Sequence, residues 1–169
     1  MIIDCHGHYT TAPEELGAYR EQQKADLARD PLFQHEKGVI DISDDQLRES
    51  VEGAQLKLQR ERGTDLTIFS PRASWMGHHV GNESTSKFWS EHCNELIYRL
   101  TQLYPENFIG GCQLPQTPGA GLDNSLAELE RCVLEFDFVG FNLNLDPSGG
   151  HWNSPPLGDR YWYPIYEKM

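Results

Sequence analysis

The chain has 169 residues, of which 38% are hydrophobic and 24% are charged, and it contains no apolar run long enough to cross a membrane. This composition, without a basic and apolar leader at its start, is typical of a soluble globular protein that is not secreted. The 26 acidic and 14 basic residues give a formal net charge of −12, which opposes binding to nucleic acid or to membranes.

Four short apolar segments, bounded by Gly or Pro, have the pattern of strands that are buried on both faces. They cover residues 1–8, 65–70, 108–114 and 138–145. The long polar stretch over residues 10–42 predicts an excursion after the first strand, with a helix around residues 13–29.

Helical patterns fill the intervals between these segments. Ser43 and Gln46 match a capping box, which predicts a helix that begins there and ends at Gly63. The apolar face of this helix comprises Leu47, Val51, Ala54 and Leu58. A second stripe, closed by Pro105, comprises Trp89, Cys93, Leu96, Leu100 and Leu103.

Two further helices follow in the last third of the chain. One is capped by Asp123, and its predicted inner face comprises Leu126, Leu129, Val133 and Phe136. The other begins near Asp159 and carries Trp162, Ile165 and Tyr166.

The alternation of strands and helices predicts a parallel sheet, either doubly wound or closed as a barrel. We expect an α/β fold of the (β/α)8 TIM-barrel class, of which this chain holds about the first four β/α units. A complete barrel usually needs about 250 residues, and Met169 lies within the fourth helical pattern. Residues 1–169 are therefore expected to be the N-terminal half of one barrel, truncated within the fourth helix.

The cysteines predict the redox environment. Cys5, Cys93, Cys112 and Cys132 are widely spaced, and no two of them form a C-x-x-C pair. Three of the four fall in apolar segments, where a free thiol behaves as a small hydrophobic group. We therefore expect no disulfides and a reducing, cytoplasmic location.

The motif with the clearest chemistry is Asp4-Cys5-His6-Gly7-His8, at the C-terminal end of the first predicted strand. Because side chains alternate along a strand, Asp4, His6 and His8 should share one face. Two imidazoles in this arrangement can converge on one metal ion, although two polar histidines at a strand end are the simpler alternative. Active sites of (β/α)8 barrels lie at this end of the strands, which favours His6 and His8 as metal ligands.

With this motif at its start, the chain resembles the amidohydrolase superfamily, whose metal lies at the C-terminal mouth of the barrel. The similarity spans essentially the whole chain and is sharpest in segments that resemble the 4-oxalomesaconate hydratase family. These segments are residues 69–74, 142–152, 154–157 and 163–167. The resemblance implies one zinc ion bound by His6 and His8, with a third histidine and a carboxylate that come from later strands, after Met169.

Several residues near the predicted strand ends are candidates for substrate binding. Arg72 follows the second strand, where a guanidinium can hold a substrate carboxylate in a bidentate fork, or is simply a surface arginine. Ser70 either donates a hydrogen bond to the substrate or caps the strand end. Asn142 and Asn144 share a face of the fourth strand, where buried amides need hydrogen-bond partners. We take Asn144, nearer the strand end, as the candidate for the site.

The sequence Pro147-Ser148-Gly149-Gly150 can direct successive N–H groups to one point, as a small anion nest, although Gly-Gly loops are more often simple turns. Gly149, Gly150 and the following His151 are therefore further candidates for substrate binding. His78 and His79, in the loop after Arg72, are either proton carriers or solvated side chains.

Together, these residues and the resemblance predict a zinc-dependent lyase, in which zinc acts as a Lewis acid or holds the attacking water. It would add water across an activated C=C bond of an oxo-tricarboxylate, 4-oxalomesaconate, in protocatechuate breakdown by 4,5-cleavage. The general base is expected outside these residues, the full-length enzyme is expected to be a homo-oligomer, and this chain alone is expected to be inactive. Two alternatives remain: a metal-dependent decarboxylase of the same superfamily, and a non-catalytic fragment of such an enzyme.

Overall fold

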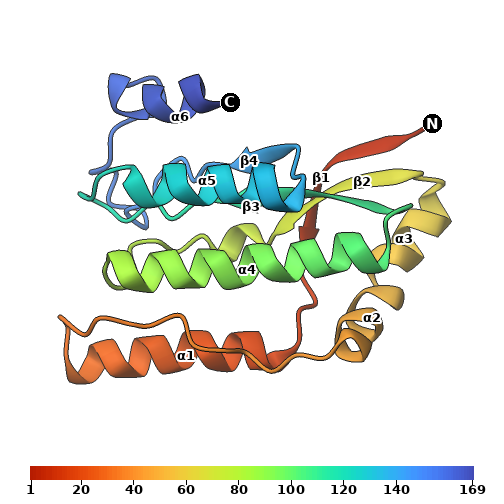
Figure 1. Cartoon of the computed structure of the whole chain (residues 1–169), viewed down its shortest axis with the longest axis horizontal. Coiled ribbons are helices and arrows are strands. Elements are labelled where there is room, and N and C mark those ends of the chain that lie inside the picture. Colours follow the sequence, from red (N-terminus) through yellow and green to blue (C-terminus); the bar gives the residue numbers. More distant parts are fainter.

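The computed structural model describes residues 1–169, and at its centre is a four-stranded parallel sheet (Figure 1). The strands are β1 (Ile3–Tyr9), β2 (Leu66–Pro71), β3 (Phe108–Gln113) and β4 (Gly140–Asn142). They lie in the order β1-β2-β3-β4, without the reversal of order that a doubly wound sheet has. The prediction of four β/α units of a barrel is therefore confirmed, and the sheet is a curled half-barrel.

Helices follow each strand and cover the sheet. They are α1 (Glu14–Arg29), α2 (Asp44–Glu52), α3 (Gln55–Arg62), α4 (Glu83–Leu103), α5 (Asp123–Phe136) and α6 (Tyr163–Lys168), with 3-10 turns at Ala73–Trp75 and Arg160–Trp162. Helix α4 packs against β2 and β3, and α5 packs against β3 and α4. In Figure 1, α1 runs alongside α4, so the predicted excursion after β1 forms an additional outer helix.

The predicted helix from Ser43 to Gly63 is in fact two helices. Its capping box and its left-handed end at Gly63 are both confirmed. A turn at Gly53 and Ala54 separates α2 from α3, because glycine is a poor helix former at the middle of the pattern. The turn redirects the second helix, so Leu58, predicted to face the core, is 44% exposed.

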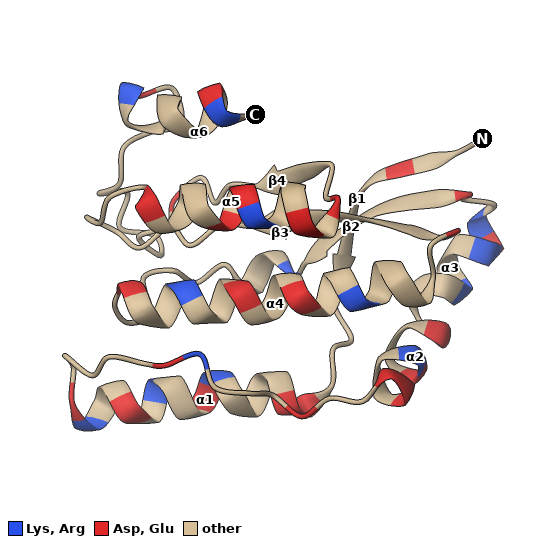
Figure 2. Ribbon diagram, viewed as in Figure 1, with Lys and Arg blue, Asp and Glu red and all other residues tan.

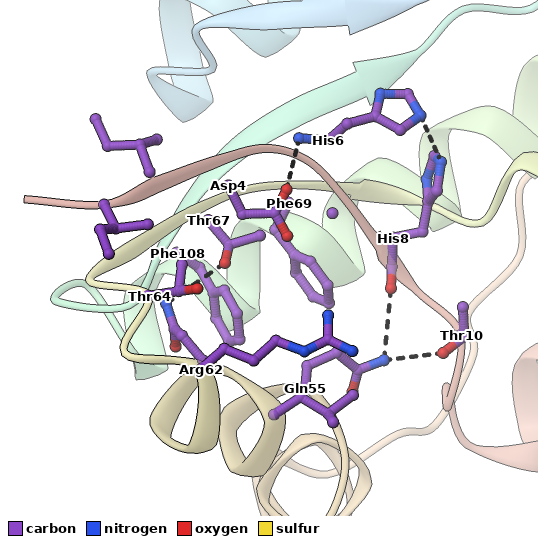
Figure 3. Close-up of a pocket in the computed structure, with 15 residues that line it drawn as sticks. Asp4, His6, His8, Thr10, Gln55, Arg62, Thr64, Thr67, Phe69 and Phe108 are labelled. Carbon is purple, nitrogen blue, oxygen red and sulfur yellow. Dashed lines mark hydrogen bonds between the residues drawn. The ribbon is translucent and has the colours of Figure 1, made fainter.

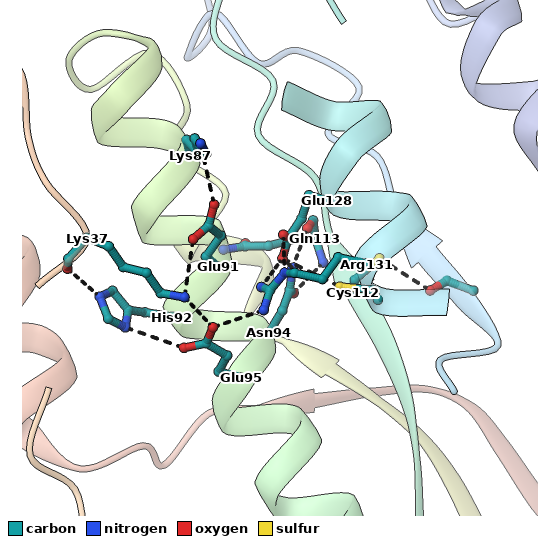
Figure 4. Close-up of polar contacts among 12 residues, drawn as sticks. Lys37, Lys87, Glu91, His92, Asn94, Glu95, Cys112, Gln113, Glu128 and Arg131 are labelled. Atoms are coloured by element: carbon teal, nitrogen blue, oxygen red, sulfur yellow. Dashed lines mark hydrogen bonds and ion pairs between the residues drawn. The ribbon is translucent and has the colours of Figure 1, made fainter. Parts of the chain in front are cut away.

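The predicted inner face of α5 is rotated by about one position. Leu129 is buried as predicted, but Val133 is 36% exposed and Glu128 takes a buried position. The Glu128 carboxylate accepts hydrogen bonds from the Asn94 amide at 2.6 Å and from the Arg131 guanidinium at 2.7 Å (Figure 4). A carboxylate that is paired in this way can be buried, which a pattern of apolar residues does not reveal.

Strand β4 comprises only Gly140–Asn142 and is therefore shorter than the predicted segment of residues 138–145. It pairs with β3 alone, and β1 pairs with β2 alone, so both outer edges of the sheet are open. Apolar side chains lie at both edges: Ile3 is 50% exposed and Val139 is 54% exposed.

Charged side chains lie mainly on the helices. Figure 2 shows acidic residues spread along α1, α2, α4 and α5 rather than gathered in one patch. No helix combines the length and apolar character that a membrane span requires. All four cysteines are free thiols, of which Cys5 is exposed and the other three are buried.

Candidate metal centre

A β-bulge in β1 determines which side chains face the candidate site. Asp4 pairs with Thr67 and Gly7 pairs with Phe69, so three steps along β1 match two steps along β2. Because of the extra residue, His8 lies on the opposite face of the strand from Asp4. The prediction that Asp4 shares a face with the two histidines is therefore wrong.

The imidazoles of His6 and His8 converge at the end of β1 (Figure 3). Their Nε2 atoms are 3.0 Å apart, and the ring planes meet at 84°. Two nitrogens bound to one tetrahedral zinc ion, each at about 2.0–2.1 Å, would be about 3.3 Å apart. The pair therefore fits two adjacent positions around a single ion. No third His, Cys, Asp or Glu of residues 1–169 joins them in a metal-holding cluster.

Hydrogen bonding fixes the ring of His8. Its Nδ1–H donates to the carbonyl oxygen of Pro71 at 3.0 Å and lies 3.0 Å from the hydroxyl of Ser70. Because a carbonyl can only accept, the neutral ring carries its proton on Nδ1 and keeps the Nε2 lone pair for a metal. Burial lowers the pKa of His8, and the nearby His6 lowers it further, against the opposing effect of the Pro71 hydrogen bond. Both the tautomer and the charge state are those of a metal ligand.

Ser70 supports His8 and is only 4% exposed. Its hydroxyl donates to the carbonyl of Gly7 at 3.0 Å and accepts from the Asn142 amide at 2.8 Å. The only donor of the Ser70 hydroxyl is thus engaged within the chain, and substrate binding by Ser70 stays a prediction. Asn142 reaches the site through Ser70, although sequence reasoning favoured Asn144.

Arg72 lies immediately after β2, as the sequence predicted. Its side chain is exposed, and no hydrogen bond or ion pair engages its guanidinium. The preceding residue, Pro71, accepts the hydrogen bond from His8, so Arg72 opens the loop next to the histidine pair. A free guanidinium in this position can pair with a carboxylate.

Asn144 lies beyond the end of β4, and its side-chain amide is already engaged. Its Nδ2 donates to the carbonyl of Met76 at 2.8 Å, and its Oδ1 accepts from the backbone N–H of Asp146 at 3.0 Å. The amide thus links two loops of this chain rather than pointing freely into the site, as the prediction of substrate binding required.

The Gly-rich segment after β4 does form a nest, but the carboxylate of Asp146 fills it. That carboxylate accepts hydrogen bonds from the Ser148 hydroxyl and from the backbone N–H groups of Ser148 at 3.1 Å, Gly150 at 2.7 Å and Trp152 at 3.3 Å. These bonds, led by that of the Ser148 hydroxyl, hold the pKa of Asp146 below its usual range. In this structure the N–H groups of the nest are thus taken by an anion of the chain itself, and binding of a substrate carboxylate by Gly149 and Gly150 stays a prediction.

The histidines of the neighbouring loops differ in their environments. His151 is exposed and has no hydrogen-bond partner, so it remains open to a ligand. His78 is fully buried with its Nδ1 2.8 Å from the Ser86 hydroxyl, and burial lowers its pKa to about 3. His79 is exposed and packs on the loop after β4, where a Cβ at Gly149 would lie only 2.5 Å from its Nδ1.

A groove of about 510 Å³ follows the open edge of β1 beside the histidine pair (Figure 3). Helix α3 forms its other side with Gln55 and Arg62. The Gln55 amide donates to the Thr10 hydroxyl at 3.0 Å and to the carbonyl of His8 at 3.4 Å. The site is thus supported from β2 on one side and from α3 on the other.

Comparison with known proteins identifies relatives over the whole chain. The sequence model of a family described as Amidohydrolase matches residues 3–169. A 2-keto-4-carboxy-3-hexenedioate hydratase from Sphingobium sp. is 55% identical over 169 residues, which are 100% of this chain and 49% of the relative. The crystal structure of a 4-oxalomesaconate hydratase from Rhodopseudomonas palustris has a TM-score of 0.87 and 52% identity, again over 100% of this chain and 49% of the other.

More distant structures share the fold. A dihydroxybenzoic acid decarboxylase from Polaromonas sp., with bound manganese and an inhibitor, has a TM-score of 0.65 at 21% identity, over 99% of this chain and 45% of the other. The chain spans about half the length of the relatives that it matches.

Proposed function

This chain belongs to the amidohydrolase family, and we propose that it forms the N-terminal half of a zinc-dependent hydratase acting on 4-oxalomesaconate. The observation that carries this proposal is the 55% identity to a 2-keto-4-carboxy-3-hexenedioate hydratase over all 169 residues. The 52% identity to a 4-oxalomesaconate hydratase supports the same reaction. The decarboxylases share only the fold at 16–21% identity, so they offer less support for the alternative.

In this proposal, His6 and His8 supply two ligands to the zinc ion, and the remaining ligands come from outside residues 1–169. Zinc bound there would act as a Lewis acid on a substrate oxygen or lower the pKa of a water molecule. The hydrogen bond from His8 to Pro71 and its contact with Ser70 hold that ring in the ligand orientation. The general base also comes from outside this chain.

The substrate carries several carboxylates, which require cationic or hydrogen-bonding partners. Arg72 follows β2 directly and its exposed guanidinium has no partner within the chain, so we assign it one carboxylate. His151, exposed in the loop after β4, is a second candidate contact. Gly149 and Gly150 contribute by shaping that loop around Asp146, and their left-handed φ angles of 75° and 99° require glycine.

We further propose that residues 1–169 form half of a single barrel that a second set of β/α units closes. The open edges of β1 and β4 support this interpretation. The complete enzyme is proposed to be a cytoplasmic homo-oligomer, consistent with four free thiols in this half.

The test is to express the complete enzyme, of which residues 1–169 are proposed to form the N-terminal half. The purified enzyme is loaded with zinc and supplied with 4-oxalomesaconate. Loss of the ultraviolet absorbance of the conjugated C=C bond, without release of CO2, is the expected result. Release of CO2 from carboxylated aromatic substrates would instead identify a decarboxylase. A His6→Ala variant should lose both bound zinc and turnover, whereas a His151→Ala variant should keep its zinc.

A further inference from the structure

Side chains from three other parts of the chain donate hydrogen bonds to the main-chain carbonyls of the loop after β2. Three consecutive carbonyl oxygens, those of Trp75, Met76 and Gly77, each accept a hydrogen bond from the side chain of a different structural element. The donors are Trp89 Nε1 of α4 at 2.7 Å, Asn144 Nδ2 after β4 at 2.8 Å, and the Arg20 guanidinium of α1 at 2.8 Å. We call these three donors the carbonyl clamp.

Asn144 connects this clamp to the other loops at the same end of the sheet. Its backbone N–H donates to Gln116 Oε1 at 2.7 Å, and its carbonyl accepts from Gln116 Nε2 at 3.2 Å. Its side chain simultaneously binds the loop after β2, at Met76, and the nest residue Asp146. One asparagine therefore ties together the loops that follow β2, β3 and β4.

Arg20 contributes a buried charge to the clamp. It is 8% exposed, its guanidinium lies 4.8 Å from the centre of the Trp89 ring, and its two hydrogen-bond acceptors, Gln23 and Gly77, are uncharged. Burying a cation without an acidic partner is costly, so its value lies in the geometry of its contacts. A planar guanidinium can bind two acceptors while it stacks on a ring, which a lysine cannot reproduce.

Arg72 lies between the clamp and the histidine pair. On one side, the carbonyl of Pro71 accepts the hydrogen bond from His8. On the other side, the first carbonyl that the clamp holds is that of Trp75, three residues later. The backbone on both sides of Arg72 is thus anchored, while its guanidinium stays free.

We infer that Arg20 and Asn144 are positioning residues, which fix the loop after β2 so that Arg72 is held ready for a substrate carboxylate. The inference rests on the proposed function, because it assigns these residues to the same site. Fixing the backbone in advance removes ordering cost from substrate binding. Loss of the clamp should therefore weaken binding of the substrate and leave the chemical step unchanged.

The experiment uses two variants of the complete enzyme that contains residues 1–169, Asn144→Ala and Arg20→Lys. Asn144→Ala removes the bonds to Met76 and Asp146 but keeps the backbone bonds to Gln116. The matched controls are Asn124→Ala on α5 and Arg29→Lys at the end of α1, which lie outside the clamp. The readouts are amide hydrogen exchange of residues 73–80, bound zinc, and KM and kcat for 4-oxalomesaconate.

Each clamp variant should speed exchange in residues 73–80 by about five- to tenfold, since one hydrogen bond contributes about 1 kcal/mol. KM should rise by about tenfold, while kcat and bound zinc stay within about twofold of the wild type. Both controls should match the wild type. If Asn144→Ala fails to fold, Trp89→Phe removes the bond to the Trp75 carbonyl together with part of a buried ring, keeps an aromatic ring beneath Arg20, and should also speed exchange in residues 73–80 and raise KM.

Unchanged exchange in the clamp variants would overturn the inference, as would faster exchange with an unchanged KM. A fall in kcat at constant KM would do the same, because it would make these residues part of the chemical step. Absence of turnover in the wild-type protein is a separate outcome, which would overturn the proposed function and the role of the clamp with it. Normal wild-type turnover with unaltered variants would overturn the clamp alone.

Discussion

Replacing Gly7 with alanine tests how closely β1 is fitted to β2 at the histidine pair. A Cβ at Gly7 would overlap Thr67 Cγ2 and would lie 3.3 Å from the carbonyl oxygen of Ile68 and 3.5 Å from the Phe69 ring. One of these neighbours is backbone, so the strand cannot relieve the contact by side-chain rotation alone. Overpacking of this kind typically costs about 1–3 kcal/mol, and we expect the free energy of unfolding to fall by that amount.

The same change should also disturb the metal centre, because Gly7 lies between the two ligands. Displacing β1 from β2 separates His8 from Pro71 and Ser70, the groups that orient its ring. Loss of such orienting contacts commonly weakens metal affinity by about 10- to 100-fold. Zinc affinity, measured by competition with a chromophoric chelator, should fall accordingly.

A second substitution, at Thr67, tests whether this steric overlap causes the loss of stability. The Cβ added by Gly7→Ala would collide with the methyl group of Thr67, and Thr67→Ser removes that methyl group. The serine keeps the hydroxyl that accepts a hydrogen bond from the Gln59 amide at 3.4 Å. In a double-mutant cycle followed by urea unfolding, it should restore about half of the lost stability, because the Ile68 carbonyl remains close. Gly17→Ala, on α1 with nothing within 4 Å of its Cβ, is the control and should stabilise the protein by about 0.5–1 kcal/mol. Additive effects of the Gly7 and Thr67 changes would refute the packing argument.

Three further outcomes follow from the site. Arg72→Ala should raise KM by about 10- to 150-fold, the equivalent of about 1.5–3 kcal/mol, with bound zinc unchanged; loss of zinc at constant substrate affinity would make Arg72 structural. Ser70→Ala should lower zinc affinity by about tenfold through His8, whereas a rise in KM alone would indicate a direct substrate contact. Burial lowers the pKa of His78 to about 3. As the pH falls below 6.5, His78 is therefore protonated in the unfolded chain but stays neutral in the folded chain. Stability should therefore be full above pH 6.5 and fall by about 1.4 kcal/mol per pH unit towards pH 3, and His78→Asn should flatten this slope in acid unfolding curves.

The sequence was sufficient for features that depend on local patterns. The capping box at Ser43, the left-handed end at Gly63 and the four parallel strands all follow from residue type and spacing. The pairing of His6 with His8 also follows from their i, i+2 positions at a strand end. These features require only the neighbours along the chain or along one strand.

Features that depend on contacts between distant elements could not be predicted in this way. The bulge in β1 reverses the face of Asp4 and is visible only in the register with β2. The anion of the Gly-rich nest is Asp146, which directly precedes the nest in sequence, and its position inside the nest depends on how the loop folds back. The partner of Asn144 is the carbonyl of Met76, 68 residues earlier. A backbone carbonyl carries no sequence signal, so such partners emerge only from the fold.

The two histidines and the two open edges lead to the same structural requirement. A zinc ion held by only two protein ligands lacks at least one ligand of a catalytic site. The sheet that positions them also leaves apolar side chains uncovered at both sides, with Ile2 58% exposed beside β1 and Val139 54% exposed beside β4. Closure of a parallel sheet into a barrel removes both edges at once and brings further strand ends to the mouth where the histidines lie. In the proposed barrel, completion of the metal centre and burial of the edges are therefore one structural event, because the same additional strands would supply the missing ligands and the missing hydrogen-bond ladders.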